Sequence, residues 1–448
     1  MSRGVASLAG AAALVAGLVL AAPTAHAEHL DLTEGAVFAM SNARDGNTVV
    51  AYYRDSAGSL IEQGRYATGG TGSGSFEDTA NGLVLGTSEG EAAPNNLIEL
   101  AGGGQQLLFA TNAGSNSIAV FQVNPDGLVR VDVEPSNGEK PVSVTVNHGI
   151  AYVLNSGEIN DDLFDADGKV IDNCTTGKVP TVTGFTITPS GHLSPINGSQ
   201  RKLVSKEATS GCAQVSFTPD GKALVVTERL AQPNRLHQTR SDNEVIDDEG
   251  VIDTWVVGRN GKLQSPRVYD ATGQGPFGFT FLKNGALLTT EQFDGPNGPG
   301  RGGAASYTTA PSGVITPSSG SVRNGGTDTC WFVAADSQTI GFTTSFFGEG
   351  RISSYALDGD GIAALIDPVA TSPIDDATAD GVEVGASDMS FNGDSRYLYQ
   401  LNSVNGTITV WANDGSGTLT FVEQQMPFPQ PVFGPGMGMA APLGLAAN

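Results

Sequence analysis

Seven stretches along this chain share one pattern: an aromatic residue, a short turn, and a glycine six positions after the aromatic. In the second copy, Phe121 is followed by the turn "NPDG", which ends at Gly127. The seven pairs are Tyr52/Gly58, Phe121/Gly127, Phe185/Gly191, Trp255/Gly261, Tyr307/Gly313, Tyr355/Gly361 and Trp411/Gly417. A unit that recurs in this way predicts a repeat architecture, in which each copy buries part of its neighbour.

The second copy contains four candidate strands, which we name a to d in chain order. Strand a is "LIELAGG", beginning near Leu97, and strands b, c and d are "QLLFATN", "SIAVFQV" and "LVRVDVE". Four antiparallel strands joined by short turns predict a blade of a β-propeller. The aromatic of each strand c then lies on a repeated surface. It is either a stripe for carbohydrate stacking or, as the burial habits of aromatic side chains favour, core between blades.

The two ends of the chain predict how the ring closes. In six copies strand a begins near Leu97, Val142, Ala213, Phe277, Trp331 and Asp388. The first copy, from Ala36, contains only strands b, c and d, and the segment Ala441–Asn448 ("APLGLAAN") resembles the strand a that begins "GPFGFTF". We therefore predict an all-β, seven-bladed propeller with four antiparallel strands per blade. Its C-terminal strand completes the N-terminal blade and leaves no open edge there.

Residues 1–27 have the features of a secretory signal peptide: Arg3, an apolar run, and the small residues "AHA" at Ala25–Ala27. The run is nearly long enough for a membrane anchor, but the small-x-small site favours cleavage. We expect residues 28–448 to form a single propeller domain, secreted as a monomer that has no contact with the membrane after cleavage. The net charge of −24 disfavours nucleic acid and anionic membrane surfaces as partners.

The long connections gather on one face of the predicted ring. In a blade, the b–c and d–a connections lie on one face and the a–b and c–d turns on the other. Three long connections follow strand b (Ser156–Pro180, Arg229–Gly250 and Gln292–Gly303), and two long d–a segments (Gly72–Asn95 and Ile366–Ala386) fall on the same face. Since loops on a rigid scaffold carry function, we predict that this b–c face is the working face and that the other has only tight turns.

The residues that end each strand b are candidates for the site, because they lie at this face near the central channel. They are Asn42, Asn112, Asn155, Glu228, Glu291, Ser345 and Asn402. An asparagine here has a simple role as a turn cap, although Asn112, Asn155, Asn402 and Ser345 are also candidates for substrate binding. Glu228 and Glu291 replace asparagine in neighbouring blades. They are either an acid/base pair, or ligands for a divalent cation such as calcium, or solvated glutamates at a loop base.

Basic residues gather beside these two glutamates. They are Arg229, Arg235, Arg240 and Arg301, with His237 between two of them. In so acidic a chain, clustered arginines suit a carboxylate or phosphate on a ligand, or else ion pairs with the local run "SDNEVIDDE". Only His237 among the histidines can serve this face, and no GxSxG elbow is present, so a Ser-His-Asp hydrolase is disfavoured.

Three cysteines are too few for a disulfide framework and enough for one bridge in an oxidising compartment. Cys212 and Cys330 each begin a strand a, two blades apart, which is too far for a bond. We predict a disulfide between Cys174 and Cys212, and a free, buried Cys330.

Several segments resemble the seven-bladed propeller lactonase family of bacterial 6-phosphogluconolactonase and fungal carboxymuconate cyclase, in its secreted bacterial branch. The resemblance covers most of the chain after residue 27. The segments that carry it are "VSFTPDGKALVVTE", "GPFGFTF", "TDTCWFVAADSQTIGFTTS" and "SDMSFNGDSRYLYQLNSVNGTITVW". It implies opening or formation of a lactone ring without a bound cofactor, with Glu228 and Arg229 matching the end of strand b in the fourth blade. Sugar-lactonase members carry a His-rich segment where this chain has Asn95 and Asn96, which argues against phosphogluconolactone as the substrate.

Two functions follow as expectations. The first is a secreted lactonase for a small anionic or sugar-like lactone, with Glu228, Arg229 and Glu291 as catalytic residues and no metal or cofactor. Arg235, His237 and Arg301 would help to bind the substrate. The second is a non-catalytic propeller that binds a ligand or protein through the same face, because propellers host both kinds of function.

Overall fold

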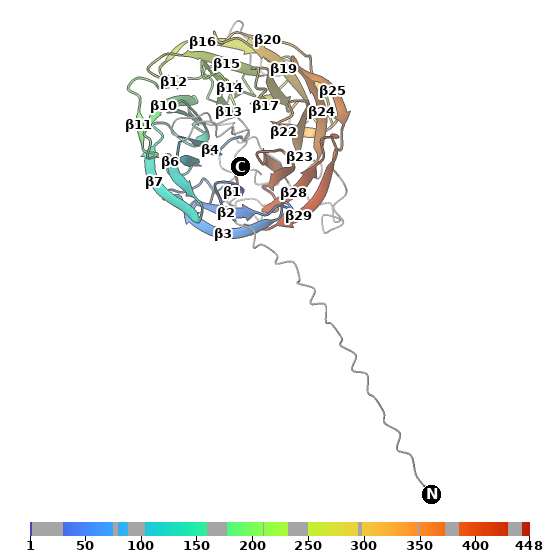
Figure 1. The fold of residues 1–448 in the computed structure, drawn as a ribbon. Helices are drawn as coiled ribbons and strands as arrows, with labels where there is room; N and C mark the ends of the chain where they lie inside the picture. Colours follow the sequence, from blue (N-terminus) through green and yellow to red (C-terminus); the bar gives the residue numbers. More distant parts are fainter. Residues whose placement is uncertain are drawn as a thin grey trace, which may run out of the picture.

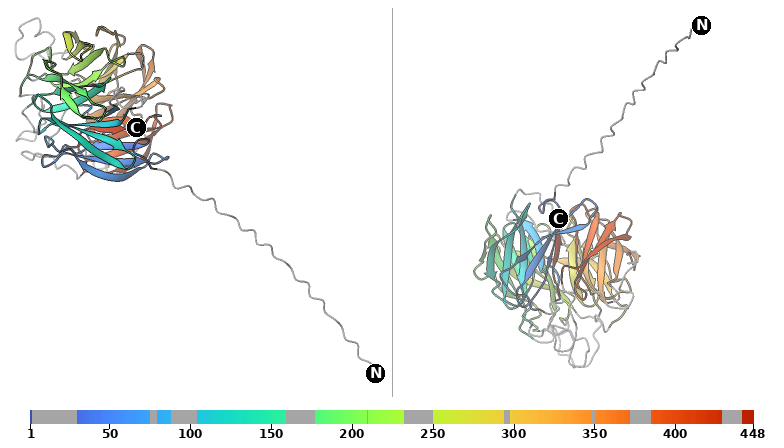
Figure 2. Two further views of the ribbon diagram at one scale, coloured as in Figure 1. Left: turned by 60° about the vertical axis from the view of Figure 1, so that its left-hand side comes forward. Right: turned by 90° about the horizontal axis from the view of Figure 1, so that it is seen from below.

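The computed structural model of this chain is a ring of seven sheets around a central axis (Figure 1). It describes residue 1 and residues 30–74, 79–87, 104–158, 177–208, 210–231, 250–293, 298–347, 350–371, 385–428 and 441–448. Each sheet has one strand near the axis and one at the rim, and a side view shows the sheets packed face to face around the ring (Figure 2). Within the described ranges, no helix is long and apolar enough to cross a membrane. The predicted seven-bladed propeller is therefore confirmed.

The blades are numbered along the chain, with strands given from the axis outwards. Blade 1 has β30 (Leu445–Ala447), β1 (Ala36–Met40), β2 (Thr48–Arg54) and β3 (Leu60–Ala67). Blade 2 has β4 (Leu83–Thr87), β5 (Gln106–Asn112), β6 (Ser117–Asn124) and β7 (Gly127–Pro135). Blade 3 has β8 (Pro141–Asn147), β9 (Ile150–Asn155), β10 (Thr181–Ile187), β11 (Leu193–Pro195) and β12 (Arg201–Lys202). Blade 4 has β13 (Cys212–Phe217), β14 (Ala223–Glu228), β15 (Val251–Val257) and β16 (Leu263–Asp270).

Blade 5 has β17 (Pro276–Phe281), β18 (Leu287–Glu291), β19 (Gly303–Thr309), β20 (Ile315–Pro317) and β21 (Val322–Arg323). Blade 6 has β22 (Thr327–Ala334), β23 (Ile340–Phe347), β24 (Ile352–Asp358) and β25 (Gly361–Asp367). Blade 7 has β26 (Ala386–Phe391), β27 (Tyr397–Asn402), β28 (Thr407–Asn413) and β29 (Leu419–Gln425). In blades 3 and 5 the outer strand is split into two short strands that both pair with strand c.

The recurrent aromatic and glycine both pack against the preceding blade. The seven aromatics are at most 3% exposed, and Trp255 shares a buried cluster with Tyr152 and Val182 of blade 3. The glycines have φ between +72° and +155°. A Cβ on Gly58 would lie 2.4 Å from the ring of Tyr397 in blade 7, which precedes blade 1 in the ring. The pattern is therefore inter-blade packing, as predicted, and glycine is required because the c–d turn touches the sheet of the preceding blade.

The C-terminal strand closes the ring as predicted. β30 pairs antiparallel with β1 through Val37↔Ala447, Phe38↔Ala446 and Ala39↔Leu445. The Asn448 side chain adds two bonds, accepting from the Ala36 N–H (2.6 Å) and donating to the Leu32 carbonyl (2.8 Å). Blade 1 therefore combines strands from both ends of the chain and leaves no open inner edge.

The innermost strand of blade 2 differs from the prediction. β4 begins at Leu83 and pairs with β5 from Leu83↔Ala110 to Thr87↔Gln106, so the prediction of a strand a near Leu97 is wrong. The segment "LIELAGG" lies outside the described residues. β4 ends at Thr87 and β5 begins at Gln106, so the a–b connection of this blade is too long for a tight turn, and most of it lies outside the described residues. The prediction that this opposite face has only tight turns is wrong for blade 2.

The axis is lined by apolar side chains near the b–c face. Ala80, just before β4, donates its N–H to the Ala213 carbonyl at the start of β13 (3.0 Å). Both residues belong to one buried cluster with Phe277, Trp331 and Ala441, which come from blades 5 and 6 and from the segment before β30. Residues far apart in sequence therefore meet around the axis at this end.

Candidate functional site

All seven residues predicted at the ends of strand b are buried. Asn42, Asn112, Asn155, Glu228, Glu291, Ser345 and Asn402 are at most 2% exposed. Several accept hydrogen bonds from hydroxyl groups of the connection that enters their blade. Asn112 Oδ1 accepts from Thr68 (2.6 Å), Glu228 Oε2 from Ser205 (2.5 Å) and Glu291 Oε1 from Thr272 (3.3 Å). In blades 2, 4 and 5 this position thus binds the blade to its incoming d–a connection.

A glycine of the d–a connection lies directly against this position in several blades. A Cβ on Gly138 would lie 2.4 Å from the Asn155 amide carbon, and one on Gly273 would lie 2.4 Å from the Glu291 carboxyl carbon. Asn155 is unusual because neither polar atom of its buried amide has a hydrogen-bond partner in the described part of the chain. Asn402, in contrast, donates to Thr407 in the following turn (3.0 Å), as a turn cap does.

Glu228 lies beneath the connection from blade 3 to blade 4. Its carboxylate accepts from the Ser205 N–H (3.2 Å) as well as the hydroxyl, and it is fully buried. Asp253 on β15 is buried beside it and accepts from the Val204 N–H (2.8 Å). Burial, and then the negative charge of Glu228, raise the pKa of Asp253 well above its ordinary value. The two carboxyl groups therefore favour a state in which Asp253 keeps a proton.

Two of the predicted arginines contact the residues that directly follow Glu291. Burial raises the pKa of Glu291, and the hydroxyls of Ser321 and Thr272 oppose this rise. Arg229, 5% exposed, donates to Gln292 Oε1 (3.2 Å). The Cζ atom of Arg301 lies 5.9 Å from the centre of the Phe293 ring.

Arg235, His237 and Arg240 lie outside the described residues. Whether they gather beside Arg229 and Arg301, as the sequence predicts, stays a prediction.

A cavity of about 400 Å³ lies on the predicted working face, over blades 1, 2 and 3. Its walls come from the b–c turns of these blades and the d–a connections between them, and they carry Arg44, Glu139, Lys140 and Glu158. Arg44 is held by a bond from Nε to the Ser73 carbonyl (2.5 Å). Asn112 and Asn155, predicted to bind substrate, end the strands directly before two of these turns. None of Glu228, Arg229 and Glu291 belongs to the cavity wall.

The ion pair in the cavity wall is almost completely buried. Lys140 Nζ lies 3.5 Å from Glu158 Oε2, and the two side chains are 6% and 4% exposed. Lys140 has φ +56°, in the left-handed region, although it is not glycine. Its backbone is fixed by bonds to Asn116 Oδ1 (2.7 Å) and from the Ser156 N–H (2.9 Å). A non-glycine residue in this region costs about 1–3 kcal/mol, and such strain is concentrated at functional sites.

Sequence reasoning missed this pair. Lys140 and Glu158 lie in two different connections, and nothing in the local sequence shows that they meet. One sequence feature could have pointed to Lys140. It is a cation directly before a proline, Pro141, in a chain with only 23 lysines and arginines against 47 acidic residues.

The cysteines and acidic groups show no metal site. No group of three or more His, Cys, Asp or Glu side chains in the described ranges is arranged to hold a metal ion. Cys212 and Cys330 are both buried, and Cys174 lies outside the described residues, so the predicted disulfide between Cys174 and Cys212 stays a prediction. Cys212 lies opposite Glu228 in the pairing of β13 with β14. Burial, with Glu158 and Glu228 as the next causes, raises the pKa of this thiol.

No protein-family model matches the chain, and a search of curated proteins finds no match. Among solved structures, its fold is similar to a protein from Lactobacillus plantarum (TM-score 0.59, 14% identity, covering 93% of this chain and 99% of that chain). It is also similar to a putative 6-phosphogluconolactonase from Bacteroides fragilis (0.56, 12%, 93% and 98%) and a hypothetical selenium-binding protein from Sulfolobus tokodaii (0.57, 10%, 93% and 93%). The predicted resemblance to lactonase propellers is thus confirmed for the fold, which alone does not select an activity.

Proposed function

We propose that this protein is a lactonase-like hydrolase that acts on a small anionic or sugar-like lactone in the cavity over blades 1–3. The observation that carries the proposal is the buried Lys140–Glu158 pair in the wall of a polar cavity, with Arg44 beside it. A strained, buried cation paired with a carboxylate is the kind of arrangement found where a protein does chemistry.

The geometry suggests a role for each group. Glu158, kept ionised by Lys140, would take a proton from a water molecule as it attacks the lactone carbonyl carbon. Lys140 and Arg44 would stabilise the negative charge that develops on the carbonyl oxygen and bind an anionic group of the substrate. When the ring C–O bond breaks, the leaving oxygen takes the proton back and a hydroxy acid results. No cofactor enters this scheme.

A second candidate function is binding without turnover. Lys140 and Glu158 neutralise each other, and such a pair suits recognition of a polar ligand as well as catalysis. For either function, we propose that the protein is exported after cleavage of residues 1–27, is monomeric and has a small molecule as its partner.

A panel of sugar, aromatic and acyl-homoserine lactones, followed by pH-stat, tests the proposal. Glu158→Gln should lower turnover by about 10²–10⁴-fold, the usual contribution of a general base. Glu228→Gln is the matched control, because it makes the same chemical change outside the cavity wall.

Loss of turnover in Glu228→Gln alone, with folding intact, would favour the site predicted from the sequence over the cavity. Flat traces for every lactone, with saturable binding of one of them by calorimetry, would favour the binding module.

A further inference from the structure

Arg54 lies at the end of β2 on the face opposite the cavity, and its positive charge is not neutralised by any described carboxylate. Among the described residues, its guanidinium makes one hydrogen bond, from Nη2 to the Glu34 carbonyl, and this bond is long, at 3.5 Å. Its Nε is buried and has no hydrogen-bond partner in the described part of the chain. The chain has 47 acidic and 23 basic residues, so an arginine without a described carboxylate partner needs an explanation.

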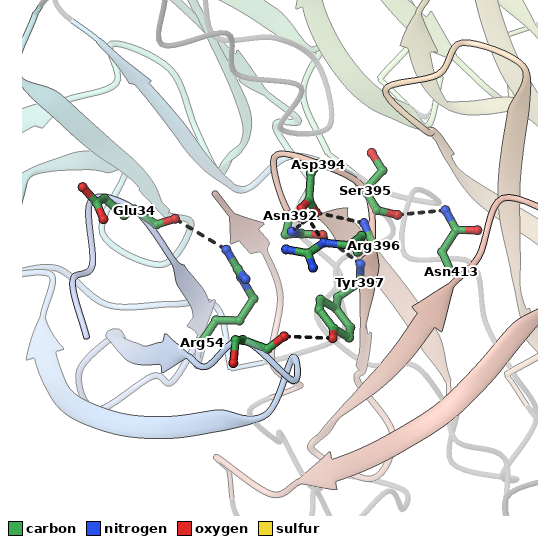
Figure 3. Close-up of polar contacts among 9 residues, drawn as sticks. Glu34, Arg54, Asn392, Asp394, Ser395, Arg396, Tyr397 and Asn413 are labelled. Atoms are coloured by element: carbon green, nitrogen blue, oxygen red, sulfur yellow. Dashed lines mark hydrogen bonds and ion pairs between the residues drawn. The ribbon is translucent and has the colours of Figure 1, made fainter. Parts of the chain in front are cut away.

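The carboxylates near Arg54 accept hydrogen bonds from residues of their own turns. Asp55 Oδ1 accepts from the N–H groups of Ala57 (2.9 Å) and Ser59 (2.8 Å). Asp394 accepts from Asn392 Nδ2 (2.5 Å) and Arg396 Nε (2.5 Å). Figure 3 shows the Arg54 guanidinium bonded to the Glu34 carbonyl, while the Asp394 side chain lies in its own turn with Asn392 and Arg396. Both carboxylates are therefore held in their own turns, and neither forms a described ion pair with Arg54.

A second unpartnered group lies close to Arg54. Tyr399 on β27 is fully buried, and its hydroxyl has no hydrogen-bond partner among the described residues. Tyr399 packs in one buried cluster with Val50 and Tyr52, which alternate along β2 on the same face as Arg54. Burial raises the pKa of Tyr399, the charge of Arg54 opposes this rise, and Asp55 and Asp394 add to it. Two residues earlier, Tyr397 donates to the Ser56 carbonyl (3.1 Å), which binds blade 7 to blade 1 here.

We infer that Arg54 and Tyr399 form a binding site for a small oxyanion, a carboxylate or a phosphate, at the seam between blades 7 and 1. The guanidinium offers Nε and Nη donors in a planar fork that matches two oxygens of such an anion. The tyrosine hydroxyl offers a further donor. A bound anion would satisfy the buried Nε and the hydroxyl and would neutralise the charge, whereas a water molecule would leave the charge uncompensated.

Thermal unfolding in inorganic phosphate, in acetate and in chloride at one ionic strength tests the site. Phosphate or acetate should raise the Tm of the wild-type protein saturably, by about 1–2 °C at tenfold excess over the Kd. Arg54→Gln should abolish this rise. Tyr399→Phe should reduce it while leaving Tm in chloride unchanged or higher, because the change removes a buried hydroxyl that has no partner.

Arg396→Gln is the matched control, since this neighbouring arginine is already paired with Asp394, and it should keep the full response. An equal response of wild type and Arg54→Gln, or no response of the wild type to either anion, would overturn the inference. If in addition Tyr399→Phe lowers Tm in chloride, the hydroxyl has a water or Arg54 as its partner and the site holds no anion.

Discussion

The buried carboxyl group of Asp388 should make the folded protein less stable as the pH rises. Asp388 lies on β26, next to the closing strand, and its carboxyl oxygens accept from the N–H groups of Leu445 (3.1 Å) and Met389 (2.9 Å). No cation in the described ranges pairs with it, and burial raises its pKa from the ordinary 3.8 to about 7. At neutral pH the innermost closing contact of the ring thus depends on a carboxyl group that is close to losing its proton.

The size of this loss in the free energy of unfolding follows from the linkage between folding and proton binding. Below pH 3.8 the group is protonated in both states, and it does not make stability depend on pH. Between pH 3.8 and about 7 the unfolded chain releases the proton while the folded chain keeps it, so stability falls as the pH rises. At about 1.4 kcal/mol per pH unit, the total loss is about 4 kcal/mol, of which about 2.5 kcal/mol falls between pH 5 and 8.5.

Urea denaturation at pH 5 and pH 8.5, for the wild type and Asp388→Asn, measures this loss. The wild type should lose about 2.5 kcal/mol more than the variant over this range. The general repulsion of a chain with net charge −24 affects both proteins equally and cancels in the comparison. An equal loss in both proteins would refute the assignment of a raised pKa to Asp388.

Three further changes test other parts of the structure. Deleting Ala441–Asn448 removes the innermost strand of blade 1, and we expect insoluble protein or a strongly lowered Tm by calorimetry; a truncated protein that melts like the full chain would contradict the closure. Lys140→Met should destabilise by about 3 kcal/mol in urea, because Glu158 loses its buried ammonium, and adding Glu158→Gln should restore part of this loss. Glu228→Gln should raise stability at pH 8 by about 1–2 kcal/mol, since the amide can donate to the unpartnered Asp253 oxygen; unchanged stability would argue against the coupled carboxyl pair.

The fold could be predicted because its main determinants are local and repeated. Each aromatic and its glycine mark a strand c and the turn after it, and seven copies fix the number of blades. The strand a of blade 2 was missed for a physical reason. "LVLGT" at Leu83–Thr87 and the apolar run near Leu97 both suit a buried strand, and only the pairing with β5 distinguishes them.

The site was less predictable because it depends on contacts between connections. The ends of strand b could be located from the repeat, but whether Glu228 points into a channel or beneath a neighbouring connection depends on Ser205, 23 positions earlier in the chain. The pairing of Lys140 with Glu158 likewise depends on how two loops meet. Sequence periodicity places strands, whereas it does not place loop side chains.

The pairing of β1 with β30 also determines how the ring would respond to mechanical force. These strands are antiparallel, and Val37, near the start of β1, lies opposite Ala447, at the end of β30. A force applied between residues 30 and 448 would therefore act at the same end of both strands and would break their hydrogen bonds one after another rather than all at once. Blade 1 should consequently be the first to open under tension, although without force the two hydrogen bonds of the Asn448 side chain stabilise it.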